Sequence, residues 1–323
     1  MIWKTMSNNL VLRILSSSVN ISAKAGSIVR DVMKTGELAV VDKGVNDLQT
    51  EADRRAQNCI ITSLSKQFPK IAIIGEETLD PNDKIDDKWI VSSFDESVLS
   101  HKCPEEWLNV TDEDIVVWVD PLDGTSEYTQ GLLDHVTVLI GLSVKGRAIG
   151  GVIHQPFYNF DKENDSTKLG RTIWGLVGLG AYGFQHRQPP VGKVIVTTTR
   201  SHSSPTINAA IEHINPDEVI RVGGAGHKVL LVIEGQAHAY VFPSRGCKKW
   251  DTCAPEAVLE SLGGRLTDVF GNQLRYDRNV EHTNELGVLA THCARTSHPY
   301  FLAKFSDDIK ASLLSSSQMK RNN

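Results

Sequence analysis

The sequence predicts a protein of mixed class, with an α+β first half and an α/β second half. Helical patterns open the chain and hairpin-forming strands follow them, whereas strands alternate with helices after a Pro- and Gly-containing break at 188–192. We therefore expect two domains, residues 1–188 and 189–323. The length of 323 residues agrees with this, since a domain commonly holds about 150 residues.

The elements of the first half follow from hydrophobic periodicity. Apolar residues recur at three- and four-residue spacing over 10–33 and 53–68, which predicts helices that flank a sheet. Short apolar runs bounded by turn residues predict the strands 71–75, 115–120, 135–143, 148–154, 172–177 and 180–185. The second half predicts strands at 193–199, 219–222 and 237–242 and helices at 205–214, 226–234 and 251–262.

The segment 114–128, DIVVWVDPLDGTSEY, carries the strongest functional signal. Pro121 favours an extended conformation for the residue before it, so we expect the buried strand to end at Asp120. Asp123 follows after a two-residue turn, and both carboxylates and the carbonyl of Leu122 can converge on a hard cation. The pattern indicates a magnesium site.

A helix start follows this acidic pair. Gly124 frees the backbone, and the amides of Thr125 and Ser126 would lie in the first helical turn, where unpaired N–H groups favour a phosphate. Taken alone, D-P-x-D-G is equally typical of a surface turn, because Asp, Pro and Gly are common turn residues.

Further acidic residues stand at element ends. Glu76 and Glu77 follow the strand 71–75, Asp251 precedes the helix 251–262 as an N-cap candidate, and Asp53 lies at the start of a helix. Each has an ordinary structural interpretation when considered singly, since acids commonly satisfy backbone donors at helix starts.

Four segments in order, TEAD, IIGEE, WVDPLDGT and WDTCAPEAVL, together resemble the inositol monophosphatase superfamily of magnesium-dependent, lithium-sensitive phosphatases. The resemblance extends from about Ala23 to Leu289. It implies a layered αβαβα sandwich and two or three Mg²⁺ ions, with inhibition by Li⁺. It also implies a set of metal ligands: Glu76, Asp120, the Leu122 carbonyl, Asp123 and Asp251.

The resemblance further implies catalytic and substrate-binding roles. Thr125, hydrogen-bonded to Asp53, would orient the metal-activated water, and Asp53 would also lie near a further, weaker metal position. Within the superfamily, VVWVDPLDGTSEYTQGLLDHVTVLIGLS, LGRTIWGLVGLGAYGFQ, TTTRSHS with VGGAGHK, and GCKKWDTCAPE resemble the enzymes that remove the 3'-phosphate from adenosine 3',5'-bisphosphate. By this resemblance the substrate would contact Gly124, Thr125, Ser126, Thr199, His202, Ser203, Gly224, Lys228 and Asp251.

Other interpretations stay open at this point. An inositol polyphosphate 1-phosphatase or an inositol monophosphatase would share the fold and metals, and the nucleotide enzyme could also remove the 1-phosphate of inositol 1,4-bisphosphate. A catalytically silent phosphate sensor would not need Thr125 and Asp53. A dinucleotide-dependent oxidoreductase is disfavoured, because the glycines at 223–226 are too irregular for the binding fingerprint. Without the resemblance, His202 would be an ordinary surface histidine.

Composition narrows the class of partner and location. The formal net charge of −5 and the dispersed basic residues argue against nucleic acid, so a small-molecule phosphate ester is the expected partner, with no obligate protein partner evident. No apolar run approaches the roughly 20 residues that cross a membrane. Five scattered cysteines suggest reduced thiols, and we expect a cytoplasmic protein. The acidic insert 81–114 carries no motif that we can interpret.

Overall fold

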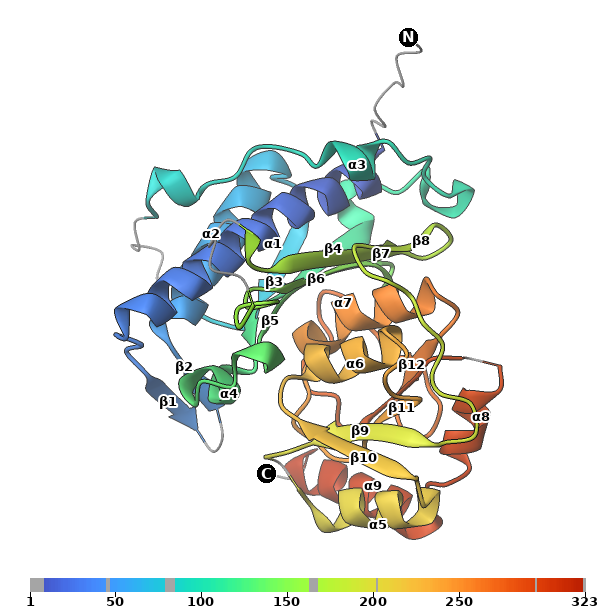
Figure 1. Ribbon diagram of the computed structural model, residues 1–323. Helices are drawn as coiled ribbons and strands as arrows, with labels where there is room; N and C mark the ends of the chain where they lie inside the picture. The colour runs from blue at the N-terminus through green and yellow to red at the C-terminus, as the bar shows by residue number, and fades with distance from the viewer. Residues whose placement is uncertain are drawn as a thin grey trace.

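A computed structural model describes residues 9–44, 47–78, 85–162, 168–201, 203–293 and 295–321. These residues form five layers: a helix pair, a six-stranded sheet, a second helix pair, a five-stranded sheet and an outer helical layer (Figure 1). The predicted αβαβα sandwich is therefore confirmed. No helix among the described residues is long and apolar enough to cross a membrane.

The first layer consists of α1 (Leu10–Thr35) and α2 (Glu51–Gln67), as the periodicity predicted. The side chain of Asn9 accepts a hydrogen bond from the Leu12 amide at 3.2 Å, and Gly36 ends α1 with a φ of 71°. Both helices bury apolar residues against the outer face of the first sheet. The chain between the two helices forms a hairpin that the sequence did not predict, β1 (Val41–Gly44) and β2 (Asp47–Gln49). Strand β1 is exposed throughout and lacks an alternation of apolar and polar residues.

The first sheet has the order β3-β4-β5-β6-β7-β8. Its β3 and β4 are parallel, and the other neighbours are antiparallel. Every residue of β4 is buried, which agrees with its apolar sequence. The strands are β3 (Ala72–Gly75), β4 (Ile115–Asp123), β5 (Thr137–Val144), β6 (Arg147–Gln155), β7 (Arg171–Leu176) and β8 (Gly180–Tyr182).

The prediction that β4 ends at Asp120 is wrong. The strand continues to Asp123, with an irregular register between Asp120 and Asp123 instead of a separate turn. Pro121 has no amide to donate to the ladder, which favours a bulge at this point. The carboxylate of Asp120 accepts a hydrogen bond from the Leu122 amide at 3.0 Å and supports the irregular backbone.

The second sheet has the order β10-β9-β11-β13-β12. Strands β9, β10 and β11 are parallel and agree with the prediction, whereas the antiparallel β12 and β13 were not predicted. The strands are β9 (Ile195–Thr199), β10 (Glu218–Val222), β11 (Ala239–Phe242), β12 (Arg265–Thr267) and β13 (Val288–Thr291). The outer helices are α5 (Pro205–Ile214), α8 (Ser297–Leu302) and α9 (Asp307–Arg321).

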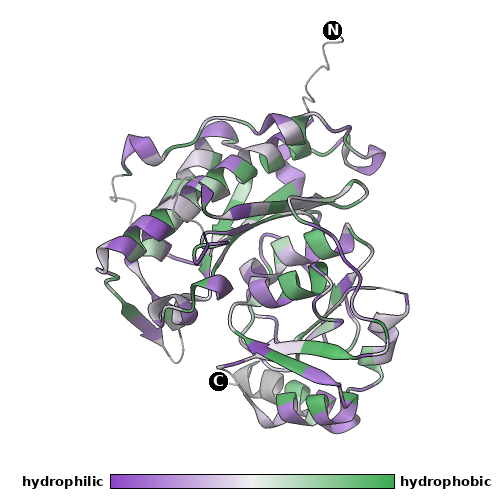
Figure 2. Ribbon diagram, viewed as in Figure 1, coloured by the Kyte–Doolittle hydropathy of each residue, from purple (hydrophilic) through white to green (hydrophobic). Residues whose placement is uncertain are grey.

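The middle layer contains α6 (Ala225–Ile233) and α7 (Lys249–Glu260), which lie between the two sheets in Figure 1. Figure 2 shows hydrophobic residues along α6 and along the strands. Helix α7 rests closely on the first sheet: a Cβ added at Gly141 would lie 2.6 Å from the Ala254 nitrogen, and one added at Gly151 would lie 2.2 Å from the Ala254 oxygen. Because α7 belongs to the second predicted domain but packs on the first sheet, the division at residue 188 stays a prediction.

Candidate active site

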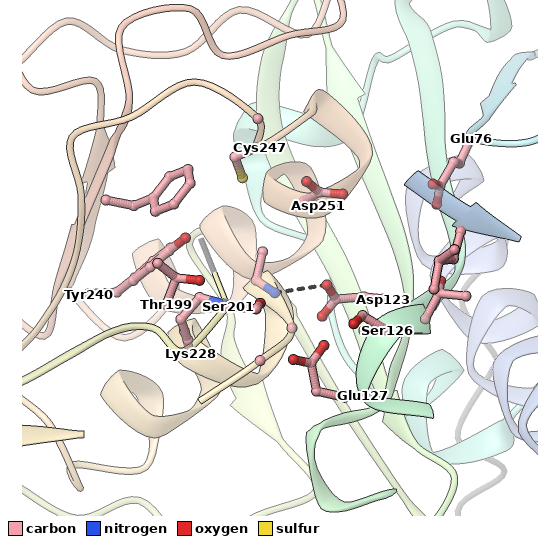
Figure 3. A pocket seen from close by; sticks show the side chains of 18 of the residues that line it. Glu76, Asp123, Ser126, Glu127, Thr199, Ser201, Lys228, Tyr240, Cys247 and Asp251 are labelled. Carbon is pink, nitrogen blue, oxygen red and sulfur yellow. Dashed lines mark hydrogen bonds between the residues drawn. The ribbon is translucent and has the colours of Figure 1, made fainter. Parts of the chain in front are cut away.

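A cavity of about 200 Å³ lies where the end of β4 meets the first turns of α4 (Thr125–Thr129), α6 and α7 (Figure 3). Elements from both halves of the chain contribute to it. The structure brings many of the predicted site residues to this cavity: Glu76, Asp123, Gly124, Thr125, Ser126, Thr199, Gly224, Lys228 and Asp251.

Asp53 is fully buried behind the cavity, in the first turn of α2. Its Oδ2 accepts hydrogen bonds from the Thr50 amide at 2.7 Å and from the Thr50 hydroxyl at 2.5 Å. Its Oδ1 accepts a bond from the Thr125 hydroxyl at 3.1 Å, the contact that the family resemblance implies. Asp53 is therefore both the capping acid of α2 and the acceptor for Thr125.

Burial raises the pKa of Asp53 to about 6, and its hydrogen bonds to Thr50 oppose this shift. The Thr125 hydroxyl has a second acceptor, the Leu122 carbonyl at 3.0 Å. One hydroxyl proton thus has two acceptors, and when it points to Asp53 the lone pairs of Oγ1 are free to accept a proton from another group.

Three carboxylates, those of Glu76, Asp120 and Asp251, interact with one another at the cavity. Asp120, itself buried, lies within hydrogen-bonding contact of Glu76 and Asp251. Burial, followed by repulsion from Asp251, raises the pKa of Glu76 to about 8, while burial and Asp123 raise the pKa of Asp251 to about 6. Such a cluster binds protons more tightly than isolated carboxylates do, unless a cation compensates its charge.

Asp123 faces α6. Its Oδ1 accepts a hydrogen bond from the Ala225 amide at 2.8 Å, and its Oδ2 accepts bonds from the Gly226 amide and the Thr137 hydroxyl, each at 2.8 Å. Figure 3 shows the side chain in this orientation. The carboxylate therefore joins the end of β4 to the N-terminus of α6. Burial raises the pKa of Asp123, and Lys228 opposes the shift.

The donor chemistry of this site fits Mg²⁺, which prefers carboxylate and carbonyl oxygens. Among the described residues, however, no three His, Cys, Asp or Glu side chains are already arranged as a metal-binding group. The position of Asp123 contributes to this, because both of its oxygens are engaged by α6 amides. A metal ion at Asp123 must therefore share the carboxylate with these two amides or break their hydrogen bonds to it.

The sequence suggested that Asp251 is the N-cap of α7, and the structure shows that this prediction is wrong. The helix begins at Lys249, so Asp251 is its third residue and Lys248 is the N-cap. The Oδ2 of Asp251 accepts a hydrogen bond from the Lys248 amide at 2.7 Å, as a capping acid does. The residue therefore has a structural role and also lines the cavity.

The nucleotide-binding residues implied by the resemblance are only partly brought together. Thr199 ends β9, and Gly224 and Lys228 belong to the start of α6; all three line the cavity. Lys228 is buried, and this burial lowers its pKa although Asp123 opposes the shift. Ser203 is exposed and is not among the lining residues; its hydroxyl donates to the Asn208 side chain at 3.3 Å. His202 lies outside the described residues.

Sequence reasoning missed several lining residues. One of them is Glu127 of α4, which forms an ion pair of 3.3 Å with Arg200. Arg200 follows β9, is not itself among the lining residues and also donates to Gln130 at 2.8 Å. Both charged residues occur inside quoted motifs, DGTSEY and TTTRSHS, and their opposite charges were the available signal. The other missed lining residues include Ser201 and Cys247, which lie inside the motifs TTTRSHS and GCKKWDTCAPE, and Tyr240, Phe242 and Arg245, which no quoted motif contains.

The comparisons with known proteins show that this chain is a phosphatase. The chain belongs to the inositol monophosphatase family, whose model matches residues 12–308. It is 51% identical over 309 residues to "3'(2'),5'-bisphosphate nucleotidase 1" of Rattus norvegicus, covering 95% of this chain and 99% of the relative. The Homo sapiens protein of the same name is 52% identical with the same coverage.

More distant relatives agree with this placement. A "Golgi-resident adenosine 3',5'-bisphosphate 3'-phosphatase" of Mus musculus is 30% identical over 310 residues, covering 91% of this chain and 80% of the relative. The solved structure of inositol monophosphatase II from Staphylococcus aureus superposes with a TM-score of 0.65 at 17% identity, covering 94% of this chain and 96% of that chain. At this identity, the structural likeness establishes the fold alone.

Proposed function

We propose that this protein is a Mg²⁺-dependent phosphatase that hydrolyses the 3'-phosphate of adenosine 3',5'-bisphosphate, giving AMP and phosphate. The observation that carries the proposal is the 51% identity over 95% of the chain to a relative named for bisphosphate nucleotidase activity. The cavity supports it, because acidic residues and the buried Lys228 line the same space.

Two or three Mg²⁺ ions would be held by Glu76, Asp120, the Leu122 carbonyl, Asp123 and Asp251, with Asp53 near a further position. When bound, the ions supply an acidified water and positive charge at the phosphate. Support comes from the raised pKa values of the cluster, since cations would relieve the repulsion that accompanies burial. We also propose that Li⁺ inhibits the enzyme.

Thr125 and Asp53 would handle the proton of the attacking water. A threonine hydroxyl is not ionised near neutral pH, so it needs a base next to it. With its proton directed to Oδ1 of Asp53, the Thr125 Oγ1 can accept the water proton as it donates its own. Asp53, whose pKa is about 6, is ionised to a large extent at neutral pH and can accept that proton.

The remaining lining residues would bind the substrate. Gly124, Thr125 and Ser126 would contact the phosphate that is removed, and Asp251 would lie next to it. Thr199, Gly224 and Lys228 would hold the nucleotide, together with His202. Lys228 is buried, so an anionic phosphate is a favourable partner for its ammonium group. Because Ser203 is exposed and outside the cavity lining, we leave it out of this set.

The test compares phosphate release from adenosine 3',5'-bisphosphate, inositol 1,4-bisphosphate and inositol 1-phosphate, with Mg²⁺ and with or without Li⁺. We expect phosphate release to be much faster from the nucleotide than from the other substrates, with slower release from inositol 1,4-bisphosphate. Li⁺ should abolish this release. A preference for an inositol phosphate would indicate an inositol polyphosphate 1-phosphatase or monophosphatase instead. No Mg²⁺-dependent release from any substrate would contradict a catalytic role.

We also propose a cytoplasmic location. The five cysteines are free in the structure, which suits a reducing compartment. Cell fractionation with an antibody to the protein tests this, and recovery in a membrane-bounded organelle would contradict it.

A further inference from the structure

The side chain of Asn284 is buried against the first turn of α7. Its Nδ2 donates to the Lys248 carbonyl at 3.0 Å and to the Thr252 hydroxyl at 3.2 Å. Its Oδ1 accepts a hydrogen bond from the Lys249 ammonium at 2.6 Å. The backbone amide of Asn284 donates to the Cys247 carbonyl at 2.8 Å. One residue thus contacts four positions around the start of α7.

The residues before Asn284 extend this contact. The Lys249 amide donates to the His282 carbonyl at 2.8 Å, and the Lys248 ammonium donates to the Thr283 hydroxyl at 3.1 Å. The segment 282–284 therefore runs beside 247–252 and is held to it at several points. The residues His282, Thr283 and Asn284 do not occur in any motif that the sequence indicated.

The contacted turn carries Asp251. The carboxylate of Asp251 accepts a hydrogen bond from the Lys248 amide at 2.7 Å, and the carbonyl of the same Lys248 is the group that Asn284 binds. Asp251 also lies close to Asp123, whose like charge repels it and would displace it. A rigid first turn resists this displacement.

We propose that Asn284 is a positioning residue for Asp251, and that by fixing the first turn of α7 it sets the affinity of the site for Mg²⁺. This inference rests on the proposed metal-binding role of Asp251. Groups that orient metal ligands commonly change metal affinity about 10- to 100-fold when they are removed.

The experiment measures Mg²⁺ binding to the full chain by isothermal titration calorimetry in the absence of substrate. Asn284→Ala should raise the Kd for Mg²⁺ about 10-fold or more. Saturating Mg²⁺ should restore most of the kcat, because the ligands themselves remain. The KM for the phosphate substrate at saturating Mg²⁺ should change little.

A matched control separates positioning from general loss of stability. Thr291→Val removes a buried hydroxyl in the same half of the chain, one that lies 3.0 Å from the His298 Nδ1 and does not contact α7 through a hydrogen bond. It should lower the Tm while the Kd for Mg²⁺ stays within about twofold of wild type. If Asn284→Ala does not fold, Thr252→Val removes one acceptor of the Asn284 side chain and should raise the Kd by a smaller factor.

Unchanged Mg²⁺ affinity in the Asn284→Ala variant, or in Thr252→Val if the first variant does not fold, would overturn the role of Asn284. An equal loss of affinity in Thr291→Val would also overturn it, because the effect would then follow stability alone. Wild-type protein that binds no Mg²⁺ would overturn the proposed metal function itself, and with it this inference.

Discussion

The Thr125 hydroxyl lies 3.1 Å from the Asp53 carboxylate, although 72 residues separate them in the chain. Two hydrogen bonds from Thr50 fix the other oxygen of that carboxylate, so Asp53 cannot rotate away without breaking the start of α2. The first turn of α2 thereby fixes the Asp53 carboxylate, and with it the direction in which the Thr125 hydroxyl at the start of α4 can donate.

Thr125→Val should lower kcat by about 100- to 10,000-fold with little change in KM, because it removes the proton-transferring hydroxyl and preserves the side-chain shape. Steady-state kinetics at saturating Mg²⁺ provides the measurement. Thr129→Val, which removes another hydroxyl bond in α4, is the matched control and should retain near-normal kcat. A small effect of Thr125→Val would contradict the role assigned to the hydroxyl.

Asp123→Asn should reduce activity by about 100-fold or more, since a proposed metal ligand should be at least as sensitive as the groups that orient it. The substitution removes the negative charge and places an amide NH₂ near the amides of Ala225 or Gly226, one of which then loses its acceptor. The rise in Tm that Mg²⁺ gives the wild-type protein should also become smaller. Near-normal turnover would exclude Asp123 from the metal ligands.

Lys228→Ala should raise the KM for adenosine 3',5'-bisphosphate about 10- to 100-fold, the usual effect of losing one hydrogen bond to a charged group. Lys228→Met keeps the buried aliphatic length beside Tyr240 and should show the same rise, which separates charge from packing. Turnover of a monophosphate should change less. Equal losses for both substrates would show that Lys228 does not serve a second phosphate.

His298 should make the protein sensitive to acid. Its buried ring lies between the hydroxyls of Thr267 at 2.9 Å and Thr291 at 3.0 Å, and burial lowers its pKa to about 4. In the unfolded chain the pKa is about 6.5, so between these values the unfolded state binds the proton more tightly. The stabilising effect of a neutral His298 is therefore present above about pH 6.5 and is lost as the pH falls towards 4.

Urea unfolding at several pH values, compared between wild type and His298→Gln, checks this sign. The free energy of unfolding of wild type relative to the variant should fall by about 2 kcal/mol between pH 7 and pH 4. The comparison cancels the opposite contribution of the acidic cluster, whose raised pKa values favour the folded state at low pH when no metal is bound. A constant difference would contradict the neutral, buried state of His298.

Local patterns accounted for most of the elements. Helix α5 follows from a Ser204 cap, a proline in the first turn and regular apolar spacing, and its observed bounds match the prediction. The acids at Glu76, Asp120 and Asp123 stood out because they follow apolar runs, but only the family resemblance grouped them; the structure shows that β3 and β4 are parallel neighbours, so their ends meet at one edge of the sheet. The bonding of Thr125 to Asp53 needed the family resemblance, since spacing alone does not bring helix starts together.

The remaining parts depend on tertiary contacts that leave no local pattern. Strand β12 has three residues, and its pairing with β13 joins Leu266 to Ala290, so neither strand is recognisable by itself. Asn284 lies in a loop whose sequence resembles any polar turn. The hydrogen bonds between Asp123 and the start of α6 were also unpredictable, because an acid at a strand end carries no signal for a helix 102 residues later in the chain.

The two glycines beneath α7 also bear on how the chain can be divided for experiments. Removing everything after residue 188 would strip α7 from the surface on which Gly141 and Gly151 lie. Trp118, Leu139 and Ile153, which share a buried cluster with α7, would then face water. The N-terminal fragment should therefore aggregate when expressed alone, and the smallest unit that can be purified in folded form must include α7.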